Sequence, residues 1–286
     1  GYEMKGLPDF FLAGCQKTAS SWTYICLKEH PEIFVPQDTD TTHYFDMFYH
    51  LGLDWYRDFY QEYNGEKVIG DTTPSYIRDF KAPQRIAEFN GQAKLIFNLR
   101  NPINRAFSHY WHEKRKEKIS FEFKECLENY DLYQDWITTG FYYRHLKRYL
   151  DYFPRENIKI MIFDDLKEDD QEFIQEIYRF LGVDDSFMPS VLNKKVNKAD
   201  YVWDLKNEVL SLVKRGVSAP LEVLGKEETI EKIRNSKLKY YLDELVLDKT
   251  EYEQGIDAKT RRRLSKIFAA ENKKLEEFLG RKLNWD

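Results

Sequence analysis

Short apolar runs alternate with amphipathic segments along most of the 286-residue chain. Four runs are rich in β-branched or aromatic side chains and are predicted to be buried strands: residues 9–13, 67–70, 94–99 and 158–163. Four segments have a helical pattern: residues 20–29, 102–111, 171–181 and 258–280. Strands that alternate with helices predict an α/β fold, in which a central parallel sheet is flanked by helices on both faces.

Residues 203–258 depart from this alternation, because they are strongly charged, mostly helical in pattern and without a convincing strand. We therefore expect one domain over residues 1–286, with residues 203–258 inserted as a helical cap. Inserted segments of such scaffolds commonly set specificity, so the cap is expected to cover the part of the functional site that selects the substrate.

The segment AGCQKTASSW, residues 13–22, links the first strand to the first helix. Gly14 is predicted to form the turn, and Lys17 adds a positive charge. Three hydroxyl side chains crowd the start of the helix: Thr18, Ser20 and Ser21. The free N–H groups of a helix start favour an anion, so the segment predicts a phosphate site. It lacks the second glycine of the triphosphatase pattern G-x-x-x-x-G-K-S/T. The simpler alternative is that Ser20 or Ser21 only caps the helix.

A second segment, LRNPINRAFSHY, also joins a strand to a helix. Arg100 ends the strand, and Ser108 lies on the helix that Pro102 opens. Because ligands bind at the carboxyl ends of strands in an open α/β sheet, this pair predicts a second anion site at the same edge. The alternative is a structural arginine pair, Arg100 and Arg105, on a surface helix.

GCQKTASSW and RNPINRAFSHY together resemble the two phosphate-binding motifs of the sulfotransferases that use 3′-phosphoadenosine 5′-phosphosulfate (PAPS). HPEIF, THYFDMFYHLGLDWYRDFY, GDTTPSYI and GFYYRHLKRYLDYFPRENIKIMIFDDL are similar to later segments of the heparan-sulfate type and its bacterial relatives. The resemblance covers roughly residues 9–200 and 258–286, and leaves the expected cap unmatched.

This resemblance implies sulfuryl transfer from PAPS, with 3′-phosphoadenosine 5′-phosphate (PAP) as product and no metal. It implies that Lys17 stabilises the leaving phosphate. The nucleotide-binding residues that it implies are Gly14, Lys17, Thr18, Ala19, Ser20, Ser21, Trp22, Arg100 and Ser108. Arg105 matches the second arginine of the motif and is expected to be a weaker ligand or a structural residue.

The proton acceptor departs from the family pattern. In the heparan-sulfate type, a glutamate two positions before a histidine is the proposed base, and Thr41 occupies that position here. Threonine cannot act as a general base at neutral pH. The remaining candidates for the base are His43, Asp46, and Asp38 or Asp40. The alternative for His43 is that it is a structural residue. We expect Lys17, His43 and Asp46 to be catalytic.

Asp38, Asp40 and Thr41 are expected to bind the acceptor. Acidic residues at a cleft favour a small neutral or cationic acceptor, such as an amine- or guanidine-bearing metabolite of secondary metabolism. The alternative is that these residues lie in a solvated loop. Asp71, in GDTTPSY, is expected to be a turn residue rather than a catalytic one.

Composition narrows the remaining classes. The net charge of −5 disfavours a nucleic-acid partner, and no apolar run approaches the ~20 residues of a membrane helix. Three cysteines without a C-x-x-C pair indicate reduced thiols and a cytoplasmic protein. Two other functions stay open: a small-molecule P-loop kinase, and a non-catalytic nucleotide-binding relative that lost the base at Thr41. The oligomeric state is not indicated.

Overall fold

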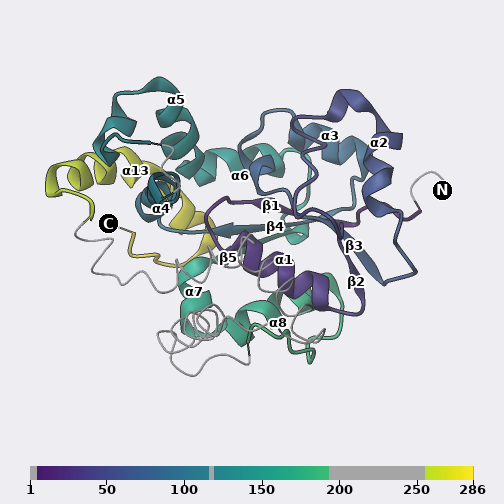
Figure 1. Ribbon diagram of the computed structural model, residues 1–286. Coiled ribbons are helices and arrows are strands. Elements are labelled where there is room, and N and C mark those ends of the chain that lie inside the picture. Colours follow the sequence, from purple (N-terminus) through teal and green to yellow (C-terminus); the bar gives the residue numbers. More distant parts are fainter. Residues whose placement is uncertain (1–4, 116–118, 193–254, 286) are drawn as a thin grey trace, which may run out of the picture.

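A five-stranded parallel sheet forms the centre of the computed structural model, which describes residues 5–115, 119–192 and 255–285 (Figure 1). The strands are β1 (Phe10–Gly14), β2 (Ile33–Phe34), β3 (Val68–Asp71), β4 (Lys94–Leu99) and β5 (Ile158–Ile162), in the order β2-β3-β1-β4-β5. All neighbouring strands run parallel. The predicted fold class is therefore confirmed. β2 was not expected, because two residues are too few to show a periodic pattern.

Alternate residues of the strands point to opposite faces of the sheet, as the period of two requires. Phe11, Leu95 and Phe97 pack on one face with residues of α3 and α6. Phe10, Leu12 and Ile96 pack on the other face with residues of α1 and α8. The helices are α1 (Ser20–Glu29), α2 (Leu53–Arg57), α3 (Ala82–Phe89), α4 (Pro102–Arg115), α5 (Tyr130–Leu132), α6 (Tyr142–Leu150), α7 (Phe163–Glu168), α8 (Asp170–Leu181) and α13 (Ala258–Leu279).

The helices expected over residues 20–29, 102–111, 171–181 and 258–280 correspond to α1, α4, α8 and α13. α3 and α6 were not expected from the sequence. Most of the expected cap, residues 203–254, lies outside the described residues, so the cap and the single-domain division stay predictions. Within the described ranges, no helix combines the length and the apolar character that a membrane crossing needs.

Gly14 is not the turn residue that the pattern predicts, because it is the last residue of β1. Its role is close packing: a Cβ atom at Gly14 would lie 2.7 Å from the Cβ of Ile77. The sharp reversal comes afterwards, where Lys17 and Ala19 adopt left-handed φ angles of 63° and 62°. Non-glycine residues rarely adopt this conformation, and where they do it is often at functional sites.

Gly14→Ala should therefore lower the free energy of unfolding by about 1–3 kcal/mol, because the added methyl group overpacks the contact with Ile77. Gly91→Ala is the matched control, since its Cβ would meet only the Ala87 carbonyl oxygen, at an ordinary 3.5 Å. Urea unfolding of both variants measures the difference. Equal stability of the two would contradict the packing role of Gly14.

Candidate functional site

The segment between β1 and α1 is tied to the neighbouring strand β4 through Asn98. The Asn98 carbonyl oxygen accepts hydrogen bonds from the Cys15 N–H and the Thr18 hydroxyl, each at 2.9 Å. The Asn98 side-chain amide donates to the hydroxyl of Thr23, at 3.1 Å. The Thr18 hydroxyl thus has a partner inside the protein. Sequence reasoning had no role for Asn98, because only the pairing of β1 with β4 reveals its position.

The amino end of α1 carries no side-chain cap. Its N-cap residue is Ala19, which makes no side-chain capping hydrogen bond. The alternative that Ser20 or Ser21 only caps the helix is therefore wrong, and both side chains are half-buried at the first turn. Trp22 packs in the core, with its ring centroid 6.0 Å from that of Phe173, so its indole anchors the helix.

Arg100 joins the two sequence motifs directly. Its guanidinium donates to the main-chain oxygen of Lys17, at 3.2 Å, and lies 4.5 Å from the centre of the Phe163 ring. Ser108 is buried on α4, which follows β4. Lys17 and Arg100 therefore meet at the carboxyl ends of the adjacent strands β1 and β4, as the sequence predicts.

A buried positive charge lies close to this loop. Arg105 is fully buried, and its Nη2 donates to the Trp136 carbonyl. Its Nε and Nη1 have no hydrogen-bond partner among the described residues. Burial lowers the pKa of His109 well below its usual value, and the charges of Lys17 and Arg105 lower it further. This cationic, donor-rich environment fits an anionic ligand.

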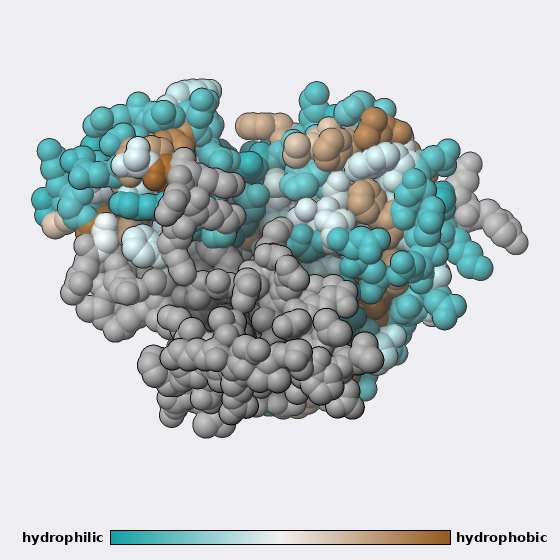
Figure 2. Space-filling view, in the orientation of Figure 1, coloured by the Kyte–Doolittle hydropathy of each residue, from teal (hydrophilic) through white to brown (hydrophobic). Residues whose placement is uncertain are grey.

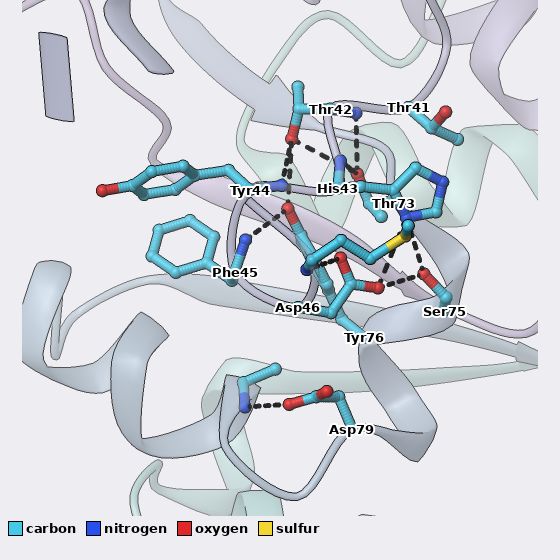
Figure 3. A network of polar contacts seen from close by, with 12 residues as sticks. Thr41, Thr42, His43, Tyr44, Phe45, Asp46, Thr73, Ser75, Tyr76 and Asp79 are labelled. Carbon is cyan, nitrogen blue, oxygen red and sulfur yellow. Dashed lines mark hydrogen bonds and ion pairs between the residues drawn. The ribbon is translucent and has the colours of Figure 1, made fainter. Parts of the chain in front are cut away.

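A three-residue cluster lies across the sheet edge, after β2 and β3. Figure 3 shows His43, Asp46 and Ser75 pointing toward one another. The Ser75 hydroxyl donates to Asp46 Oδ2 at 2.6 Å, and His43 Nδ1 lies 3.3 Å from the same oxygen. His43 Nδ1 also lies 3.2 Å from Ser75 Oγ. Ser75 was not identified from the sequence, because no motif places it beside His43.

These contacts define the protonation of the cluster. An ionised carboxylate only accepts hydrogen bonds, so the contact with Asp46 requires the hydrogen on Nδ1 of His43. Burial raises the pKa of Asp46, but hydrogen bonds from His43 and Ser75 outweigh it, so that its pKa lies below the ordinary value. Asp46 is therefore ionised at neutral pH and orients the imidazole.

A cleft of about 1050 Å³ opens beside this cluster. It is lined by Gln16, His43, Asp46, Met47, Ser75, Arg78, Asp79, Phe80, Tyr130, Asp131, Tyr133, Gln134, Asp135, Thr138, Phe141, Arg144, His145 and Arg148. Figure 2 shows the surface hollowed between the part that carries α5 and the part that carries α2 and α3. Because Gln16 lies in the segment between β1 and α1, the cleft connects this segment with His43.

The three residues expected to bind the acceptor lie elsewhere. Asp38, Asp40 and Thr41 are not among the residues that line this cleft. Asp38 is exposed, and Figure 3 shows the Thr41 side chain turned away from Asp46. Burial raises the pKa of Tyr24, on α1, and the nearby charges of Asp40 and Asp38 raise it further. Both aspartates thus lie on the side of α1.

Asp71 is also placed differently from the expectation. It is not a turn residue but the last residue of β3, and it is completely buried.

Within the described residues, no group of three or more histidine, cysteine, aspartate or glutamate side chains is arranged to hold a metal ion.

Comparison with known proteins supplies the family. The family model of the sulfotransferase domain matches residues 7–267. The chain is 30% identical over 195 residues to human bifunctional heparan sulfate N-deacetylase/N-sulfotransferase 3, covering 62% of this chain and 22% of that protein. It is 30% identical over 189 residues to mouse heparan sulfate glucosamine 3-O-sulfotransferase 3B1, covering 64% of this chain and 48% of that protein. The chain thus spans less than half of each relative.

Solved structures share the fold. A sulfotransferase from Alicyclobacillus acidocaldarius superposes with a TM-score of 0.69 at 22% identity, covering 97% of this chain and 98% of that one. Mouse sulfotransferase SULT7A1, solved in complex with PAP, superposes with a TM-score of 0.52 at 13% identity, covering 93% of this chain and 85% of that one. Because the family model spans most of the sequence, and the described sheet matches the fold of these structures, the chain belongs to the sulfotransferase family.

Proposed function

We propose that this protein transfers a sulfuryl group from PAPS to a hydroxyl or amine of a small, neutral or cationic acceptor. One observation carries the proposal: a single cleft reaches from Gln16, in the anion-binding loop, to the imidazole of His43. The donor and the proton acceptor would then lie on opposite sides of one reacting group.

The residues present fit a doubly phosphorylated nucleotide. The uncapped start of α1 and the charge of Lys17 would hold the 5′-phosphate, and Arg100 with Ser108 would hold the 3′-phosphate. PAPS, when bound, supplies a sulfuryl group on a phosphate leaving group. Lys17 would stabilise the charge that develops on that phosphate as its bond to sulfur breaks.

His43 is the proposed general base. Its Nδ1–H is held by Asp46 and Ser75, so Nε2 is left to take the proton from the acceptor hydroxyl or amine. Asp46 would stabilise the imidazolium that results, since the two groups lie 3.3 Å apart. This arrangement provides a base although Thr41 replaces the family glutamate.

The charges of the cleft support the proposed acceptor class. Four aspartates face three arginines along its lining: Asp46, Asp79, Asp131 and Asp135, against Arg78, Arg144 and Arg148. Arg78 is already paired with Asp135, and the Nε of Arg144 lies 3.7 Å from Oε1 of Glu271. A cleft with this balance has little excess positive charge for a polyanionic glycan. The proposal therefore keeps the acceptor class inferred from the sequence, but assigns it to different carboxylates.

Removing the donor charges should weaken nucleotide binding. We expect Lys17→Met and Arg100→Met each to raise the Kd for PAP by roughly 10- to 100-fold, because each loses a charge-assisted contact with phosphate. Lys28→Met, at the exposed far end of α1, is the matched control. Calorimetry with PAP and, separately, with ATP and magnesium measures this. Preferential binding of ATP would favour the kinase alternative instead.

Removing the base should slow turnover without changing nucleotide affinity. His43→Gln should lower kcat by roughly 10²–10⁴-fold, the usual contribution of general base catalysis. His50→Gln, at an exposed position, should behave as the parent does. A parent that binds PAP but turns over no member of an acceptor panel would indicate the non-catalytic relative.

The acceptor class can be tested by competition. With PAPS as donor, we expect kcat/KM for small amine- or guanidine-bearing hydroxyl compounds to exceed that for heparan sulfate chains by at least about tenfold, from charge complementarity. Asp131→Asn, an exposed change in the lining, should reduce this preference. A clear preference for the glycan would overturn this part of the proposal and leave the donor assignment intact.

A further inference from the structure

Asp71 is a buried carboxylate surrounded by hydroxyl groups. It is 0% exposed, and within the described residues its hydrogen-bond partners are all hydroxyls. Four hydroxyls donate to it: Thr42 at 2.8 Å, Tyr56 at 2.6 Å, Thr73 at 2.6 Å and Tyr76 at 2.9 Å. Burial raises the pKa of Asp71 above its ordinary value, and the four hydrogen bonds offset only part of this rise.

The carboxylate decides how these hydroxyls are oriented. A hydroxyl has one hydrogen and two lone pairs, and an ionised carboxylate can only accept. Each hydroxyl that donates to Asp71 therefore turns its lone pairs away from it, toward other donors. An uncharged amide at this position would itself donate and would force at least one hydroxyl to reverse.

The donors that these lone pairs meet are the main-chain N–H groups of residues 42–45. Thr73 Oγ1 accepts from Thr42 at 3.0 Å and from His43 at 3.4 Å. Thr42 Oγ1 accepts from Tyr44 at 3.3 Å, and the Tyr76 hydroxyl accepts from Phe45 at 3.2 Å. Figure 3 shows these contacts around Thr42, Thr73 and Tyr76. Four consecutive N–H groups are thus held by three oxygens that all donate to Asp71.

The segment held in this way carries the proposed base. His43 has a left-handed φ of 50°, which a non-glycine residue keeps only when its surroundings impose it. Asp46 lies three residues further along, and Ser75 lies two residues after Thr73. The segment that carries His43 and the segment that carries Ser75 are therefore both connected to Asp71 through hydrogen bonds.

We propose that Asp71 is a positioning residue for the proton acceptor: through Thr42, Thr73 and Tyr76 it holds His43 so that Nδ1 faces Asp46 and Nε2 faces the cleft. This inference rests on the proposed role of His43 as base. It differs from a purely stabilising role because it predicts a change in the imidazole itself.

The test measures the tautomer of His43 by long-range ¹H–¹⁵N NMR on the full chain labelled at histidine, with His43→Gln to assign the signal. In the parent, the neutral Nδ1–H tautomer should exceed the other by at least about tenfold, because its hydrogen bond goes to a charged group. Asp71→Asn and Thr73→Val should lose this excess. Thr73→Ser, which retains the hydroxyl, should restore it.

Two tyrosine variants separate positioning from stability. Tyr76→Phe removes a hydroxyl that both donates to Asp71 and accepts the Phe45 N–H, and should disturb the tautomer. Tyr60→Phe removes a buried hydroxyl of the same core that donates to the Gly70 carbonyl, and should not. If Asp71→Asn or Thr73→Val does not fold, the comparison of Tyr76→Phe with Tyr60→Phe still tests the inference. An unchanged tautomer in every folded Asp71, Thr73 and Tyr76 variant would overturn the inference.

The nucleotide assay keeps the two proposals apart. Because the hydrogen bonds of Asp71 go to Thr42, Tyr56, Thr73 and Tyr76 and not to the segment between β1 and α1, the folded variants should bind PAP within about twofold of the parent. If the parent itself did not bind PAP, the proposed function would be wrong. The tautomer of His43, measured by NMR, would still decide whether Asp71 positions the imidazole.

Discussion

The position of β1 between β3 and β4 is the constraint on which the site depends. In a parallel sheet all strands end at the same edge, so the segments that follow β1, β2, β3 and β4 meet there. These segments carry Lys17, His43, Ser75 and Arg100 respectively. The hydrogen bond from Arg100 to the Lys17 carbonyl, and the bonds that join residues 42–43 to Thr73, are consequences of this one pairing order.

Two charged side chains near the site are fully buried, and they differ in their hydrogen bonds. Arg105, on α4, has two nitrogen atoms, Nε and Nη1, without a hydrogen-bond partner among the described residues. Asp71, at the end of β3, is equally buried, but its carboxylate accepts hydrogen bonds from four hydroxyl groups. A buried charge is costly unless it is compensated. The first arrangement leaves buried N–H groups without a partner among the described residues, and the second gives a buried carboxylate whose hydrogen-bonding capacity is used within the protein.

The base side also shows how the chain accommodates its departure from the family pattern. Thr41 occupies the position at which the heparan-sulfate type has a glutamate. The imidazole of His43 and the carboxylate of Asp46 lie two and five residues further along the chain, and both contact the hydroxyl of Ser75. The carboxylate of Asp46 remains ionised because hydrogen bonds outweigh its burial. His43 is therefore held beside the cleft by contacts with Asp46 and Ser75, and this is the arrangement on which its proposed role as base rests.

The sequence by itself determined the fold class, the four longer strands, and the position of Lys17 and Arg100 at one edge of the sheet, because strands and helix starts have local patterns of spacing. It also pointed to His43 and Asp46, which lie three residues apart. It could not reveal Ser75, Asn98 or the burial of Asp71 at the end of β3, and it misplaced the turn at Gly14. These depend on which strands are neighbours and on what a buried atom touches across the sheet, and contacts between residues so far apart in the chain are decided only when the tertiary structure forms.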